Sequence, residues 1–253
     1  MKNKFILLIQ ALIFIFFTLL WEFLSRYNII NSFIFSSPIK IIICISNLFK
    51  NNNLVYHIYI TLKEIIVSFS LSIILSFLIS LLFYNYKILY KISEPFLTII
   101  NSIPKVSIGP LIIILFGANN NSIIIMALSI TLIVNILTFY NGFINVDKNL
   151  LKVLEIYNAT KKDKLKYLVI PSAISNIISG LKINISLTLI GVIMGEFLVS
   201  KAGIGYLIIY GSQVFNLTIV MSGILILIII SCLLYLLIKY IEKYFKNKTH
   251  ILY

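Results

Sequence analysis

Several uninterrupted apolar runs restrict the fold of this chain more than any other feature of its sequence. An α-helix needs roughly 20 apolar residues to cross the hydrocarbon core of a bilayer, and these runs are long enough to do so. Of the 253 residues, 60% are hydrophobic and only 11% are charged. We therefore expect an all-α membrane protein in which residues 1–253 form a single transmembrane domain.

Six spans are expected, and the distribution of lysine orients them. Their expected bounds are about 5–24, 60–84, 96–116, 123–144, 176–198 and 217–238. The first run follows Lys2 and Lys4 as a signal peptide would, but it ends at Trp21 and Glu22 without a small-residue cleavage site. We interpret it as a retained span. Most of the 21 Lys and Arg residues lie in segments that would face the cytoplasm, so the positive-inside rule places both termini there.

Composition also excludes several classes of function. In a soluble protein a net charge of +13 would suggest nucleic acid, but lysines in cytoplasmic loops that face anionic lipid explain it here. His57 and His250 are the only histidines, and Cys44 and Cys232 lie far apart, so no metal site or catalytic cluster is expected. The sequence also lacks a Gly-x-x-x-x-Gly-Lys-Ser/Thr phosphate-binding loop. We expect no enzyme activity and no cofactor.

Two smaller patterns concern how helices begin and pack. Ser37 precedes Pro38, a typical helix start, and the segment 39–50 is expected to be a helix that lies along the membrane surface. Within the second expected span, serines recur every four residues. They are Ser68, Ser72, Ser76 and Ser80. Small residues at this spacing let helices approach closely, so they predict a packing face.

The longest polar segment, 147–171, is the candidate site. Leu151 and Leu154 recur at helical spacing, which predicts two short amphipathic helices joined by a turn. Asn158 would form that turn in a left-handed conformation, and Pro171 would end the second helix. Six lysines lie in the segment, at positions 148, 152, 161, 162, 164 and 166. A basic helix-turn-helix between two spans should lie in the cytoplasm and dock onto another protein.

The spacing in this segment resembles that of permeases from ATP-binding-cassette (ABC) importers. Their cytoplasmic loop reads Glu-Ala-Ala, three residues, Gly, nine residues, then Ile-x-Leu-Pro. Counted back from Pro171, this chain has Ile170, Leu168 and Asn158 at the Leu, Ile and Gly positions. The three leading positions hold Lys152, Val153 and Leu154, so the glutamate and both alanines are missing.

The flanking sequence is similar to the nitrate, sulfonate and taurine branch of this family. That branch typically reads Pro, Ile-Pro, Pro-Leu, Phe-Gly before the loop and Gly-Leu-Arg, Ala-Glu, Gly-Leu-Gly after it. The matching positions are Pro95, Ile103, Pro104, Gly109, Pro110, Leu111, Phe116 and Gly117, then Gly180, Leu181, Lys182, Gly195, Glu196, Gly203 and Gly205. Their joint order is more specific than any single dipeptide.

The resemblance implies a type I ABC importer (MetI-like) permease fold in a bacterial cytoplasmic membrane. Its partners would be a cytoplasmic ABC ATPase dimer, a second permease copy, an extracytoplasmic solute-binding protein and membrane lipid. The ATPase-docking residues would be Lys152, Glu155, Asn158, Ala159, Thr160, Lys161 and Pro171, and the pathway or hinge residues Pro104, Pro110, Glu196, Gly203 and Gly205. The solute would be small, in the range of sulfonates, taurine, nitrate or thiamine-precursor pyrimidines.

Two other functions remain open from the sequence. An ion-coupled secondary transporter needs ionisable groups inside the membrane. Glu196 is the best candidate, with Glu64 and Lys182 near the ends of spans. We expect Glu196 instead to have a structural role, in which it caps backbone donors or pairs with Lys182 or Lys201. A membrane partner subunit that does not itself transport is the second alternative, because the glutamate of the loop is missing.

Overall fold

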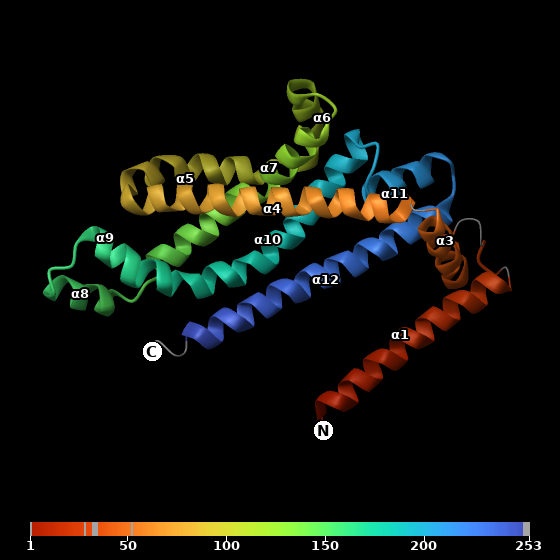
Figure 1. Ribbon diagram of the computed structural model, residues 1–253, viewed down its shortest axis with the longest axis horizontal. Helices are drawn as coiled ribbons and strands as arrows, with labels where there is room; N and C mark the ends of the chain where they lie inside the picture. The colour runs from red at the N-terminus through yellow and green to blue at the C-terminus, as the bar shows by residue number, and fades with distance from the viewer. Residues whose placement is uncertain (1, 28, 32–34, 52, 250–253) are drawn as a thin grey trace. The chain divides into compact units, whose positions relative to one another are not determined.

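The computed structural model describes residues 2–27, 29–31, 35–51 and 53–249, and these residues form helices and their connections without any strand. Figure 1 shows the helices in chain order. Their bounds are α1 Lys2–Arg26, α3 Pro38–Lys50, α4 Asn53–Asn85, α5 Lys87–Ser102, α6 Lys105–Phe116, α7 Asn120–Ile144, α8 Lys148–Ile156, α9 Lys161–Lys164, the π-helix η1 Leu165–Val169, α10 Ile170–Val199, α11 Ile204–Gln213 and α12 Leu217–Thr249.

The chain divides into two compact units, one formed by residues 1–60 and 201–228 and the other by residues 61–200 and 229–253. In the first unit α1 packs on α3. Ser37 caps α3 by accepting a 3.3 Å hydrogen bond from the Lys40 N–H, and Pro38 occupies the first turn, as the sequence predicts. The expected helix at 39–50 is therefore present as α3.

The second unit is built around the pair α7 and α10, which pack extensively against each other. Glycines on α10 make this contact close. A Cβ atom on Gly191 would lie 2.5 Å from the Cα of Ala127, and one on Gly195 would lie 2.9 Å from the Cα of Ile123. The backbones of α7 and α10 can approach to this extent only because both positions on α10 lack a side chain.

The serine stripe of α4 packs against α7, which confirms the predicted packing face. All four serines are buried. The Ser80 hydroxyl donates to the Ile136 carbonyl over 2.9 Å, and the Asn135 side-chain amide donates to the Ser72 hydroxyl over 2.8 Å. The hydroxyl groups of Ser72, Ser76 and Ser80 thus find partners inside the protein, whereas the buried Ser68 hydroxyl has none among the described residues.

In the described part of the chain, five helices are long and apolar enough to span a membrane. The third expected span, 96–116, differs from the expectation because it is not one helix. It is the end of α5 followed by α6, and the two helices meet at 97°. Pro104 stands at the break, where it has no N–H to donate and disfavours helical geometry at Ile103. Counting this bent pair as one broken span gives up to six spans.

Two further segments differ from the sequence-based bounds. Between the expected spans 176–198 and 217–238, residues 204–213 form the helix α11. Gly203 immediately precedes it with φ of 115°, a conformation that side-chain-bearing residues rarely adopt. The last helix, α12, continues to Thr249, beyond the expected end at 238.

Candidate functional site

The segment 147–171 begins with α8, which lies on a small apolar core of the second unit. The Asp147 side chain caps the helix by accepting a 2.7 Å hydrogen bond from the Asn149 N–H. Leu151 and Leu154, one face of α8, pack against a buried cluster that includes Phe143 and Leu168. The predicted amphipathic helix is thus present, and its apolar side is anchored to the ends of α7 and α10.

The turn after α8 is a Schellman motif with Asn158 in the left-handed position. The Ala159 N–H donates to the Leu154 carbonyl and the Asn158 N–H donates to the Glu155 carbonyl, both over 2.9 Å. Asn158 has φ of 55°, which confirms the left-handed conformation predicted for it. Two backbone hydrogen bonds therefore fix the direction in which the chain leaves α8.

A capping box starts the second half of the segment, and the sequence analysis overlooked it. The Asp163 N–H donates to the Thr160 hydroxyl oxygen, while the Thr160 N–H donates to the Asp163 carboxylate over 3.0 Å. The hydroxyl and N–H of Thr160 also lower the pKa of Asp163, because they stabilise its charged form. The pattern Thr-x-x-Asp after the turn is the signal that could have found it.

Pro171 does not end a helix, and this part of the prediction was wrong. The chain remains helical from Lys161 to Val199, passing through the π-helix at 165–169. In that segment the Ile170 N–H bonds to the Leu165 carbonyl, five residues back. The wider turn accommodates a proline ring that would clash with the carbonyl four residues earlier in a regular α-helix.

The tip of the segment exposes apolar side chains to solvent. Ile156 and Tyr157 are 78% and 79% exposed, and they immediately precede Asn158. Lys152 and Glu155 are exposed on α8, and the Glu155 carboxylate pairs with Lys164 over 2.9 Å. Exposed apolar side chains on a stiff, basic helix-turn-helix are typical of a surface that binds a partner.

A buried acidic pair occupies another part of the second unit. Glu196 is 1% exposed, and it accepts a 2.6 Å hydrogen bond from the Thr61 hydroxyl. The carboxyl group of Glu64, 2% exposed, faces it. Lys182, one of the partners expected for Glu196, instead pairs with Glu242. The sequence places Glu64 and Glu196 far apart, so only the packing of α4 against α10 reveals the pair.

The remaining residues that were expected to line the pathway or act as hinges lie in different parts of the chain. Pro104 lies at the α5–α6 break, and Pro110 lies inside α6. In the first unit, the Gly203 N–H donates to His57 Nδ1 over 2.9 Å, and Gly205 is buried in α11. Among the described residues, no group of three His, Cys, Asp or Glu side chains could hold a metal ion.

Comparison with known proteins decides the family. Residues 72–249 match the family described as the binding-protein-dependent transport system inner membrane component. The chain belongs to this family. It is thus the permease subunit of an ABC importer, a multi-pass inner-membrane protein that lacks catalytic activity of its own and carries no cofactor. Transport of this kind implies an ATPase and a solute-binding protein as partners.

Curated relatives cover most of the chain at low identity. The chain is 24% identical over 225 residues to the putative aliphatic sulfonates transport permease protein SsuC of Bacillus subtilis, covering 88% of this chain and 81% of the relative. It is 27% identical over 206 residues to the formylaminopyrimidine transport permease protein ThiX of Halalkalibacterium halodurans, covering 81% and 82%.

Solved structures confirm the fold. The MetNI methionine ABC transporter in an inward-facing conformation matches 76% of this chain and 96% of its own chain, with a TM-score of 0.66 and 17% identity. An amino acid ABC transporter solved with histidines matches 81% and 97%, with a TM-score of 0.63 and 17% identity. The expected type I importer permease fold is therefore correct.

Proposed function

We propose that this permease receives the movement of its ATPase through the segment 147–171, which we call the coupling loop. The single observation that carries the proposal is the construction of this loop. A Schellman turn and a capping box hold the exposed tip of Ile156 and Tyr157 above a core shared with α7 and α10. A stiff tip that packs on the spans can transmit a displacement, whereas a flexible one would absorb it.

The orientation of the chain in the membrane follows from the same proposal. If the coupling loop contacts an ATPase, it lies in the cytoplasm, and both termini lie on that side in a chain of six spans. The lysines in the loop favour this orientation through the positive-inside rule. We also propose that two copies of the permease form the pathway, since one ATPase dimer offers two equivalent docking sites.

The solute that we propose is a small organic molecule of the aliphatic sulfonate or formylaminopyrimidine class. Support comes from SsuC, an aliphatic sulfonate permease, and ThiX, a formylaminopyrimidine permease, because most of the chain is similar to both. Taurine and nitrate also remain candidate solutes because of the sequence resemblance. The solute-binding protein would select among them, and the permease would supply the route.

The buried carboxyl pair favours a second candidate, an ion-coupled secondary transporter. Ionisable groups buried inside the membrane are rare and are often functional. Glu64 and Glu196 would have to bind and release the coupling ion during transport. If ATP drives transport, by contrast, Glu64 and Glu196 lie between α4 and α10 and do not exchange an ion.

Uptake by proteoliposomes separates these candidates. The vesicles contain the permease, the partner ATPase and the binding protein, and they receive a labelled alkanesulfonate or formylaminopyrimidine. We expect uptake that requires ATP on the ATPase side and persists without a proton or sodium gradient. Uptake that needs the gradient and ignores ATP would contradict ATP-driven coupling through the loop and favour ion coupling at the carboxyl pair.

A further inference from the structure

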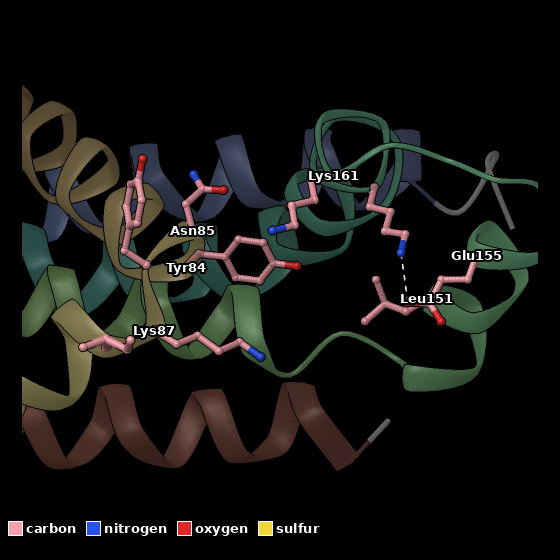
Figure 2. Close-up of a pocket in the computed structure, with 9 residues that line it drawn as sticks. Tyr84, Asn85, Lys87, Leu151, Glu155 and Lys161 are labelled. Atoms are coloured by element: carbon pink, nitrogen blue, oxygen red, sulfur yellow. Dashed lines mark hydrogen bonds and ion pairs between the residues drawn. The ribbon is translucent and has the colours of Figure 1, made fainter.

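A cavity of about 590 Å³ lies between the end of α4 and the coupling loop. Four helices and one connecting residue contribute to it. Its lining residues are Tyr84, Asn85, Tyr86, Lys87, Ile88, Leu151, Glu155, Lys161 and Lys164. Figure 2 shows the Lys161 side chain extending toward the Tyr84 ring, and the Lys87 side chain running along the opposite side of the ring in this view. A small-molecule site typically has a volume of about 300–1,000 Å³, so this cavity is large enough for a ligand well beyond a single ion.

The cavity carries positive charge that the described residues do not neutralise. Lys164 is paired with Glu155 over 2.9 Å. Lys87 and Lys161 form no ion pair with any described carboxylate. The lining therefore holds two ammonium groups in excess, next to the hydroxyl of Tyr84 and the amide of Asn85 as further hydrogen-bonding groups. An anion with several acceptor oxygens matches this set of donors.

The depth of the cavity in the membrane indicates what kind of anion it binds. The apolar stretch of α4 ends at Asn85, so the cavity borders the end of this candidate span, where we place the membrane–water interface. Tyrosines such as Tyr84 and Tyr86 favour this interface. Ile88 lines the cavity and is 76% exposed, which leaves an apolar surface beside the lysines. A ligand with a charged head and an apolar tail satisfies both parts of the lining.

We propose that this cavity binds the phosphate-bearing headgroup of an anionic phospholipid, with the phosphate between Lys87 and Lys161. Basic pockets between spans on the cytoplasmic side bind such headgroups in other membrane proteins. The exposed tip of the coupling loop, Ile156 and Tyr157, is not part of the lining. Glu155 and Lys161, which the sequence resemblance assigned to ATPase docking, do line it, and the proposal assigns them to lipid instead. The headgroup would then connect the loop to α5.

The test measures phospholipid binding to the full-length permease in detergent by native mass spectrometry. We expect phosphatidylglycerol to bind more tightly than phosphatidylcholine with the same acyl chains. The variant K87Q/K161Q should weaken phosphatidylglycerol binding about tenfold, since each lysine near the membrane surface contributes to attraction of anionic lipid. K91Q/K162Q is the matched control, because it removes two exposed lysines from the same two helices that do not line the cavity.

Three further arms make the outcome decisive. K87R/K161R keeps both charges and should keep most of the binding, and a single symmetric peak in size-exclusion chromatography shows that each variant is folded. Millimolar inorganic phosphate should displace little lipid, whereas full displacement would mean a site for free phosphate. Equal losses in K87Q/K161Q and K91Q/K162Q, or equal binding of the two lipids, would overturn the proposal. Release of the lipid when the ATPase binds would assign the cavity to the ATPase instead.

Discussion

Asn158 is the residue of the coupling loop whose backbone most restricts substitution, because its φ of 55° is unfavourable for most side chains. Asn158→Gly should be tolerated, since glycine adopts this conformation freely. Asn158→Val should cost about 1–2 kcal/mol, because a β-branched residue crowds the next carbonyl there. We expect the apparent Tm of the detergent-solubilised permease to fall by a few degrees in the valine variant only. Equal Tm values for the two variants would contradict this account of the turn.

Glu196 tests whether the buried carboxyl pair couples transport to an ion. Glu196→Gln keeps an oxygen that can accept the hydrogen bond from Thr61, and it removes one of the two facing carboxyl groups. We expect ATP-driven uptake within about threefold of the unmodified permease, because the amide maintains the contact between α4 and α10. Glu196→Leu is the comparison, and it should impair folding because the Thr61 hydroxyl loses this acceptor. Abolished uptake in a well-folded glutamine variant would support ion coupling.

At the scale of helices, the α7–α10 contact depends on glycine at one point and not at another. Gly191→Ala would place a Cβ atom 2.5 Å from the Ala127 backbone, so the helices must separate, at a cost of about 1–3 kcal/mol. Gly142→Ala would place its Cβ 3.5 Å from the Ala173 Cβ, an ordinary contact. Thermal unfolding followed by size-exclusion chromatography should show a lower midpoint for Gly191→Ala alone. Similar midpoints would mean that the contact relaxes easily.

The helices were predictable where a single local signal determines them. Apolar runs of sufficient length predicted the spans, and the serine spacing of α4 predicted the face that packs on α7. Asn158 was predictable because asparagine is one of few residues that accept a left-handed backbone. In each case the residues that determine the structure lie within a few helical turns of one another.

Other features depend on packing between distant segments, so local sequence signals predicted them wrongly or not at all. Proline usually ends a helix, but the π-helix before Pro171 lets the chain continue, and packing of the core around Val169 and Ala173 accompanies it. The pairing of Lys182 with Glu242 likewise depends on a neighbouring helix. For the same reason, Glu64 could not be assigned to the site of Glu196 from the sequence.

For the whole transporter, the coupling loop should tolerate added charge only where no partner contacts it. Ala159 is half-buried beside the turn, and Ala159→Asp would bury a carboxylate against the ATPase at a cost of a few kcal/mol. We expect at least a tenfold loss of ATPase co-purification, with membrane insertion unchanged. Asn149→Asp is the control, since it adds the same charge at the exposed start of α8. Co-purification unaffected by Ala159→Asp would contradict docking at the turn.

The most direct test of ATP-driven coupling is to identify what touches the loop tip in the assembled transporter. A photo-reactive amino acid replaces Tyr157, 79% exposed at the tip, or Phe215, 75% exposed between α11 and α12. After irradiation of cells that express the permease with its ATPase and binding protein, mass spectrometry identifies the cross-linked partner. Our account predicts a permease–ATPase adduct from position 157 and none from position 215. An ATPase adduct from position 215, or a binding-protein adduct from position 157, would contradict it.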